Sequence, residues 1–383
     1  MTTTPPQASE EQSLSLVTCP YCDQEVPTGA FCGNCGSHLL DEGGRSRIHH
    51  FAASPTEQVF RMAIITTFFP HLPRRHAHLF RETFVAGVLL VILLSSLRLY
   101  APALIAAVVL LPVLYLLYFY EVEVWEGHQL QVIAGTFGIG GVFGVAFSLG
   151  FGHIVKFTLN GTQQGPLFSG VLLPVVGQLC MLVGPLLFLR GRKTNEALDG
   201  LTFGVASALG FTAASVIAGY WHVLTAPLLG SVTTTEQIAG IVRAAILAGV
   251  VNAAATGIIC ASLWLRHHGR SRKRHDHFVL RLPSAVFVAF GFQIILGLIT
   301  YYVTSILFDA ILWAIGAALL LVWLRVTIHH ALLEEGDGLV IGEPSACAEC
   351  HHLVPTMYFC PMCGAARSAV LKPTRPGIVV APQ

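Results

Sequence analysis

DGLTFGVASALGF, residues 199–211, lies in the middle of the apolar region that decides the fold, residues 166–265. Three apolar spans follow one another in this region: 166–189, 199–222 and 237–265. Each span is long enough to cross ~30 Å of hydrocarbon as an α-helix. Gly200 and Gly204 form a G-x-x-x-G motif in the middle span, which lets another helix backbone approach closely. Three such spans in succession are typical of a membrane protein.

The composition of the whole chain also indicates a membrane protein. Of its 383 residues, 54% are hydrophobic and 11% are charged, whereas soluble proteins average ~25% charged residues. The formal net charge is +1, so we expect the lipid bilayer as a partner and no nucleic acid. The fold class predicted is an all-α polytopic membrane bundle with about eight transmembrane helices. The expected spans are 80–97, 101–120, 130–151, 166–189, 199–222, 237–265, 283–302 and 305–326.

Eight of the ten cysteines form four Cys-x-x-Cys pairs, two near each end of the sequence. In both modules nine residues separate the two pairs. A tetrahedral Zn²⁺ takes four thiolates, and each pair presents two of them from one tight turn. Disulfides or a redox pair are the alternatives. The spacing favours two small zinc-ribbon domains that flank the bundle, with one structural Zn²⁺ each. The expected ligands are Cys19, Cys22, Cys32 and Cys35 in the first ribbon, and Cys347, Cys350, Cys360 and Cys363 in the second.

The two cysteine modules are an internal duplication. A Val-Pro dipeptide recurs as Val26-Pro27 and Val354-Pro355, and an aromatic residue, Phe31 or Phe359, precedes each third cysteine. Each module is too small to bury a core, so a metal must supply its folding energy. The expected order is a disordered N-terminus at 1–17, a zinc ribbon at 18–40, a linker with a candidate interfacial helix at 41–78, the transmembrane domain at 79–330, a linker at 331–345, a zinc ribbon at 346–366 and a disordered tail at 367–383.

Residues 199–211 resemble the signature of PrsW-type intramembrane metalloproteases, Asp-Gly-x-x-Tyr-Gly-x-x-x-Gly-Leu-Gly-Phe. The resemblance covers residues 100–265, and it implies presumed metal ligands and a general base on three successive spans. This sequence departs from the family at those positions. Gly177 and Gln178 replace two glutamates, Ser215 replaces a third and Asn252 replaces a histidine. None of these four side chains is a carboxylate or an imidazole, which a catalytic metal would need.

These departures favour a non-catalytic function. We expect a PrsW-like pseudoprotease, a binding, scaffold or sensor protein that meets a protein partner through its zinc ribbons or the small-residue span 199–222. The first alternative is an active PrsW-family metalloprotease with atypical ligands such as Glu121, Glu123 or His128. The second is a transporter or channel built around Arg243 and Asp309, two charges within expected spans. These two residues either pair with each other or reach the nearby interface.

Lys and Arg residues alternate between the expected loops. One side of the membrane collects basic residues at 74–81, at 190–193, at 266–281 and at Arg325, whereas the other side has only Arg98 and Lys156. By the positive-inside rule the crowded side is cytoplasmic. We therefore expect an integral protein of a prokaryotic plasma membrane. Its two termini and both ribbons would lie in the cytosol, where thiols stay reduced.

Overall fold

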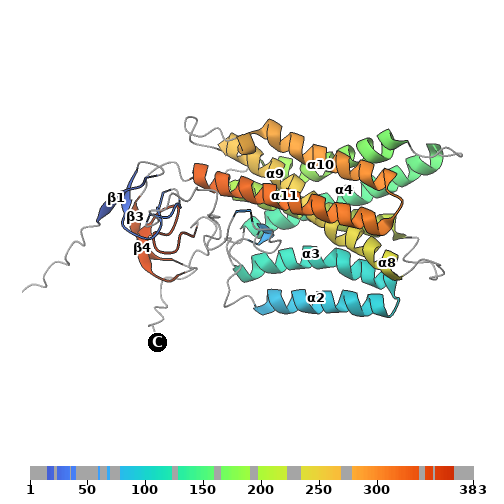
Figure 1. Cartoon of the computed structure of the whole chain (residues 1–383), viewed down its shortest axis with the longest axis horizontal. Helices are drawn as coiled ribbons and strands as arrows, with labels where there is room; N and C mark the ends of the chain where they lie inside the picture. Colours follow the sequence, from blue (N-terminus) through green and yellow to red (C-terminus); the bar gives the residue numbers. More distant parts are fainter. Residues whose placement is uncertain are drawn as a thin grey trace, which may run out of the picture.

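A computed structural model provides the fold of this protein. It describes residues 15–20, 24–34, 36–39, 59–60, 67–69, 78–122, 128–158, 165–189, 197–221, 234–268, 278–335, 341–347 and 350–365. Long helices form a bundle, and two small β-hairpins lie together at one end of it (Figure 1). Among the described residues, eight helices are long and apolar enough to cross a membrane, which confirms the predicted helical bundle.

The helices follow the expected spans closely. In chain order they are α2 (His78–Ser96), α3 (Tyr100–Val122), α4 (His128–Thr158), α5 (Leu173–Phe188), α6 (Ala197–Gly219), α8 (Thr234–Ile241), α9 (Ala248–His268), α10 (Leu282–Tyr302) and α11 (Ile306–Glu335). A π-helical segment, Leu167–Leu172, leads into α5, and another, Val242–Leu247, joins α8 to α9 as one long span. A short 3₁₀ helix, Phe278–Leu280, precedes α10.

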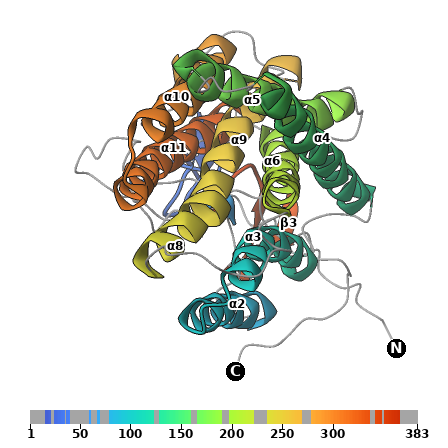
Figure 2. The same cartoon turned by 90° about the vertical axis from the view of Figure 1, so that its right-hand side faces the viewer.

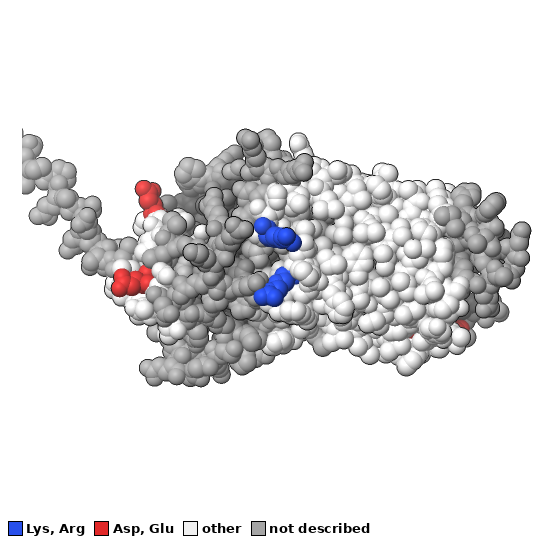
Figure 3. Space-filling model, turned by 90° about the horizontal axis from the view of Figure 1, so that it is seen from above, with Lys and Arg blue, Asp and Glu red and all other residues white. Residues whose placement is uncertain are grey.

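The outer surface of the bundle suits a lipid environment. Large apolar side chains such as Leu89, Leu187 and Phe287 are exposed on α2, α5 and α10. On the face that Figure 3 shows, uncharged residues form a continuous band along the described bundle, and basic side chains lie where the bundle meets the ribbon end. An apolar band of this kind is what a bilayer requires of a spanning protein.

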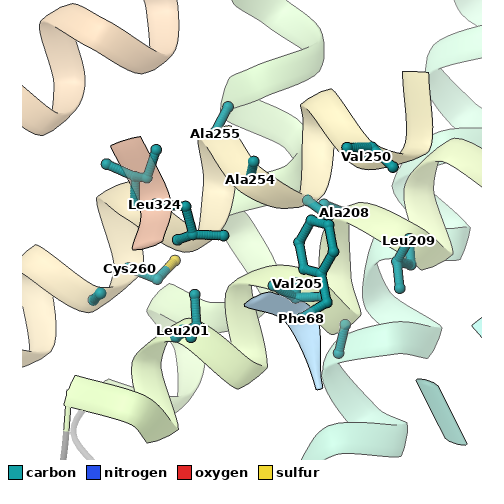
Figure 4. Close-up of a cluster of buried hydrophobic side chains, with 14 of the residues drawn as sticks. Phe68, Leu201, Val205, Ala208, Leu209, Val250, Ala254, Ala255, Cys260 and Leu324 are labelled. Atoms are coloured by element: carbon teal, nitrogen blue, oxygen red, sulfur yellow. The ribbon is translucent and has the colours of Figure 1, made fainter. Parts of the chain in front are cut away.

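Helices α6 and α9 are the most buried of the spans, and the other helices surround them (Figure 2). Glycine lets them pack closely. A Cβ atom on Gly200 would lie 2.7 Å from the carbonyl oxygen of Cys260, and one on Gly204 would lie 3.0 Å from that of Thr256. Figure 4 shows the buried cluster between them, with Leu201 and Val205 of α6 and Ala254 of α9. Van der Waals packing of this kind drives helix association in a bilayer.

The opposite side of α6 packs on α4. A Cβ atom on Gly210 would meet the carbonyl oxygen of Phe137, and one on Gly140 would meet that of Ser207. The small residues of the span that was predicted to offer a groove therefore contact two helices of this chain, α4 and α9. This arrangement explains why α6 lies so deeply inside the bundle.

Each of the two predicted ribbon regions, for which we keep the name ribbon, contains one antiparallel hairpin. Strand β1 (Leu16–Thr18) pairs with β2 (Glu25–Pro27), and β3 (Gly342–Ala346) pairs with β4 (Leu353–Thr356). Val17 lies opposite Val26, and Ser345 lies opposite Val354. Ordered structure thus begins two or more residues before the predicted ribbon boundaries at 18 and 346. The cause is that the first strand precedes the first cysteine, and cysteine spacing carries no signal for it.

Parts of three predicted segments lie outside the described residues. Of the expected disordered ends, residues 1–14 and 367–383 lie outside the described residues, whereas Leu16 and Val17 of the first one lie in β1. Most of the candidate interfacial helix within 41–78 also lies outside them. Where that linker is described, Val59, Phe68 and Phe69 are buried in the main core with Phe80 of α2. These three side chains therefore pack against the bundle.

Candidate functional site

The cysteines of the second ribbon form a candidate metal site. The four sulfur atoms of Cys347, Cys350, Cys360 and Cys363 all lie within 4.8 Å of one another. The sulfurs of Cys347 and Cys363 are 3.8 Å apart, and those of Cys350 and Cys360 are 3.7 Å apart. In a tetrahedral site with Zn–S bonds of ~2.3 Å, neighbouring sulfurs are about 3.8 Å apart. The geometry therefore fits one tetrahedral zinc ion.

Backbone hydrogen bonds shape the two turns that carry these cysteines. The Cys347 amide donates to the carbonyl of His352 at 2.9 Å, and the Gly364 amide donates to the carbonyl of Cys360 at 2.8 Å. Gly364 has a φ of +72°, in the left-handed region that favours glycine. The turns thus hold the sulfurs in place through the backbone.

The surroundings of the cluster raise the pKa of two of its thiols. Burial raises the pKa of Cys350 to about 11. Hydrogen bonds with Cys347 and then Cys360 raise the pKa of Cys363. Cys350 and Cys363 therefore hold their protons more tightly than free thiols do, until a cation replaces those protons. Zinc binding here would release protons and would weaken as the pH falls.

The first ribbon repeats this local geometry. Residue n of the first ribbon corresponds to residue n + 328 of the second. The Cys19 amide donates to the carbonyl of Gln24, and the Gly36 amide donates to that of Cys32, both at 2.9 Å. Cys19 and Cys32 are buried together, whereas Cys22 and Cys35 lie outside the described residues. The structure thus shows one four-sulfur cluster and half of the expected ligands of the other.

A second candidate site lies inside the bundle, where α5, α6, α9 and α10 meet. Gln178 Nε2 donates to Thr256 Oγ1 at 3.1 Å. Gln293 Nε2 donates to Gln178 Oε1 at 3.2 Å and to Asn252 Oδ1 at 2.8 Å. Asn252 Nδ2 in turn donates to Thr212 Oγ1 at 2.8 Å. We call these five residues the amide cluster.

The amide cluster contains two of the four residues singled out in the sequence, Gln178 and Asn252, and Gln293 bridges them. Ser215 lies one turn away and donates to the carbonyl of Thr212 at 3.1 Å. Gly177 packs near the rings of Phe147 and Phe211. Gln293 is absent from the predicted site. Its signal in the sequence is a lone amide within the apolar span 283–302.

The groups of the amide cluster satisfy one another. Both polar atoms of the Gln178 side chain and both of Asn252 have partners within the cluster. Neutral amides and hydroxyls are poor zinc ligands, and they do not act as general bases near neutral pH. Within the described ranges, the cysteine cluster is the only group of three or more His, Cys, Asp or Glu residues that could hold a metal ion.

Arg243 and Asp309 form an ion pair, with 3.3 Å between Arg243 Nε and Asp309 Oδ2. Thr300 Oγ1 donates to Asp309 Oδ1 at 3.1 Å, and Trp313 Nε1 donates to Thr300 Oγ1 at 2.8 Å. The guanidinium lies 5.6 Å from the Trp313 ring centre, within range of a cation–π contact. The pairing neutralises two charges that would each be costly alone in a bilayer.

The atypical ligands of the protease alternative come from one region of the chain. Glu121 lies in the last turn of α3, and His128 begins α4. Glu123 lies outside the described residues.

The fold and the cysteine cluster define a class: a polytopic helical membrane protein that carries a four-cysteine site suited to a metal ion. Comparison with models of protein families, with curated proteins and with solved structures found no match.

Proposed function

We propose that this protein is a PrsW-like pseudoprotease, a membrane protein that binds its partners without cleaving them. The observation that supports the proposal is the composition of the amide cluster. The resemblance to PrsW-type metalloproteases places metal ligands at Gln178 and Asn252. Here both side chains are neutral, and they are hydrogen-bonded to Gln293, Thr212 and Thr256.

The chemistry of hydrolysis explains why this composition matters. Peptide hydrolysis at such a site needs a metal-activated water and a base that accepts its proton. Gln178 and Asn252 offer amides in place of carboxylate and imidazole groups. Loss of a general base alone costs ~10²–10⁴-fold in rate. A cluster of mutually bonded amides is instead suited to holding four helices in register.

The ribbons supply the proposed binding function. Each ribbon would hold one structural Zn²⁺ through four cysteines, which leaves no coordination position for a catalytic water. The small residues of α6 contact α4 and α9, so the ribbons are the better surface for a protein partner. Both ribbons lie at one end of the bundle (Figure 1). From the positive-inside rule we expect that end to face the cytosol.

The transporter alternative depends on Arg243 and Asp309. These residues are paired, and Thr300 and Trp313 complete their surroundings. The pair links the long α8–α9 span to α10 and α11. We therefore assign it a structural function in the bundle.

A proteolysis assay tests the proposal. Purified wild-type protein is incubated with candidate single-span membrane proteins, beside Gln178→Ala, Asn252→Ala and the control Leu179→Ala, whose side chain is exposed on α5. We expect no cleavage above background by any of the four. Cleavage by wild type and by Leu179→Ala that is lost in Gln178→Ala or Asn252→Ala would restore the protease alternative.

A further inference from the structure

The two ribbons contact each other through a nearly symmetric set of hydrogen bonds. The Phe31 amide donates to the carbonyl of Pro361, and the Phe359 amide donates to the carbonyl of Gly33, both at 2.9 Å. By the offset of 328 residues, Phe31 corresponds to Phe359 and Gly33 corresponds to Pro361. Each ribbon therefore donates one backbone hydrogen bond to the other and accepts the equivalent bond from it, as in an isologous dimer interface.

The side chains repeat the same symmetry. The Phe31 ring lies against Gly364, where an added Cβ atom would be 2.6 Å from Phe31 Cδ1. The Phe359 ring lies against Gly36 with the corresponding distance of 2.9 Å. Gly36 and Gly364 have φ values of +71° and +72°. Both positions thus require glycine for two reasons: the backbone is left-handed there, and the ring of the opposite ribbon leaves no room for a Cβ atom.

The contacting residues belong to the metal-binding turns themselves. Phe31 and Phe359 each precede the third cysteine of their ribbon, and Gly36 and Gly364 each follow the fourth. A metal ion that fixes one turn therefore also fixes the surface on which the other ribbon packs. Phe359 is only 1% exposed and belongs to the main hydrophobic cluster, so its ring packs on Gly36 of the first ribbon and also joins the ribbon pair to the bundle.

We propose that the two ribbons form one two-zinc clasp, in which the metal site of each ribbon stabilises the other ribbon. This inference rests on the proposed zinc binding by both ribbons. Because metal binding and ribbon folding are coupled, the two ions bind cooperatively. The clasp joins the segment before α2 to the segment after α11, so it ties the two ends of the helical bundle together.

The first test removes one metal site in the full-length protein in detergent. Cys360→Ser combined with Cys363→Ser destroys the second site, and mass spectrometry follows alkylation of Cys19 and Cys32 in the first. We expect the zinc content to fall from two ions to fewer than one. We also expect alkylation of Cys32 to accelerate on the order of tenfold or more. Retention of one ion with unchanged protection of Cys32 would overturn the clasp.

The second test leaves all eight ribbon cysteines in place. Phe31→Ala removes the ring that covers Gly364, and we expect faster alkylation of Cys360 in the opposite ribbon. Leu353→Ala is the control, because Leu353 is 74% exposed. A Phe31→Ala effect confined to Cys19 and Cys32 would contradict the coupling. Wild type that binds fewer than two ions would instead refute the proposed zinc function, so the two failures are distinguishable.

Discussion

Single polar side chains inside the bundle connect neighbouring helices through one or two hydrogen bonds each. Gln293 is 5% exposed, and its Nε2 group serves Gln178 and Asn252 at once. A buried acceptor that loses its donor inside a bilayer has no water to replace it. The identity of residue 293 therefore affects two neighbouring helices as well as its own.

Gln293→Leu should lower the free energy of unfolding by about 1–2 kcal/mol, because two acceptors lose their common donor. Ile295→Ala is the matched control on the same helix, since Ile295 is exposed toward lipid. Thermal unfolding in detergent compares the two variants. If Gln293→Leu has the same melting temperature as wild type and retains both zinc ions, the amide cluster does not hold the helices together.

The ion pair between Arg243 and Asp309 offers a second test of a single side chain. Asp309→Leu leaves Arg243 without its carboxylate, and we expect a loss of about 1–3 kcal/mol. The loss is smaller than for a fully buried pair, because the Arg243 side chain is 24% exposed. The double variant Arg243→Met with Asp309→Leu should be less destabilised than Asp309→Leu alone. If the stability losses of the two single variants, measured by thermal unfolding, add up to the loss of the double variant, the two charges act independently.

Helices approach one another closely only where the sequence provides glycine. Gly210 of α6 faces the carbonyl of Phe137 on α4, so Gly210→Ala should separate the two helices and lower the melting temperature strongly. Gly138 of α4 is the matched control, since nothing lies within 4 Å of a Cβ atom added there. Gly138→Ala should leave the melting temperature unchanged or slightly higher, because alanine favours a helix. Equal effects of the two variants would argue against this packing.

The elements could be predicted from the sequence to very different degrees. The eight spans were predictable because hydrophobicity is a local property of ~20 consecutive residues. The four-cysteine cluster of the second ribbon was predictable from its spacing. The bridging contact of Gln293 was not, since its partner Gln178 is 115 residues away and no periodicity connects them. The contact between Phe31 and Gly364 was missed for the same reason, although the repeated aromatic residue was visible.

The whole molecule has both ribbons at one end of the bundle, as an even number of spans requires (Figure 1). A fluorescent protein fused after Gln383 should therefore fluoresce in the cytosol, and alkaline phosphatase fused there should be inactive. Insertion of the same reporters between α4 and α5 should give the opposite pattern. Phosphatase activity at Gln383 would invert the proposed orientation.

The contact between the ribbons also sets an order of events during synthesis. The first ribbon leaves the ribosome before the eight described spans, but the aromatic ring that covers its Gly36 belongs to Phe359, 323 positions later in the chain. At ~5–20 residues per second, the first ribbon waits roughly 15–65 s for that ring. All eight helices are translated in the interval. The two ribbons can therefore come into contact only after the last helix has been translated. In a chain truncated within α11, Gly36 of the first ribbon would lack the Phe359 ring that packs on it.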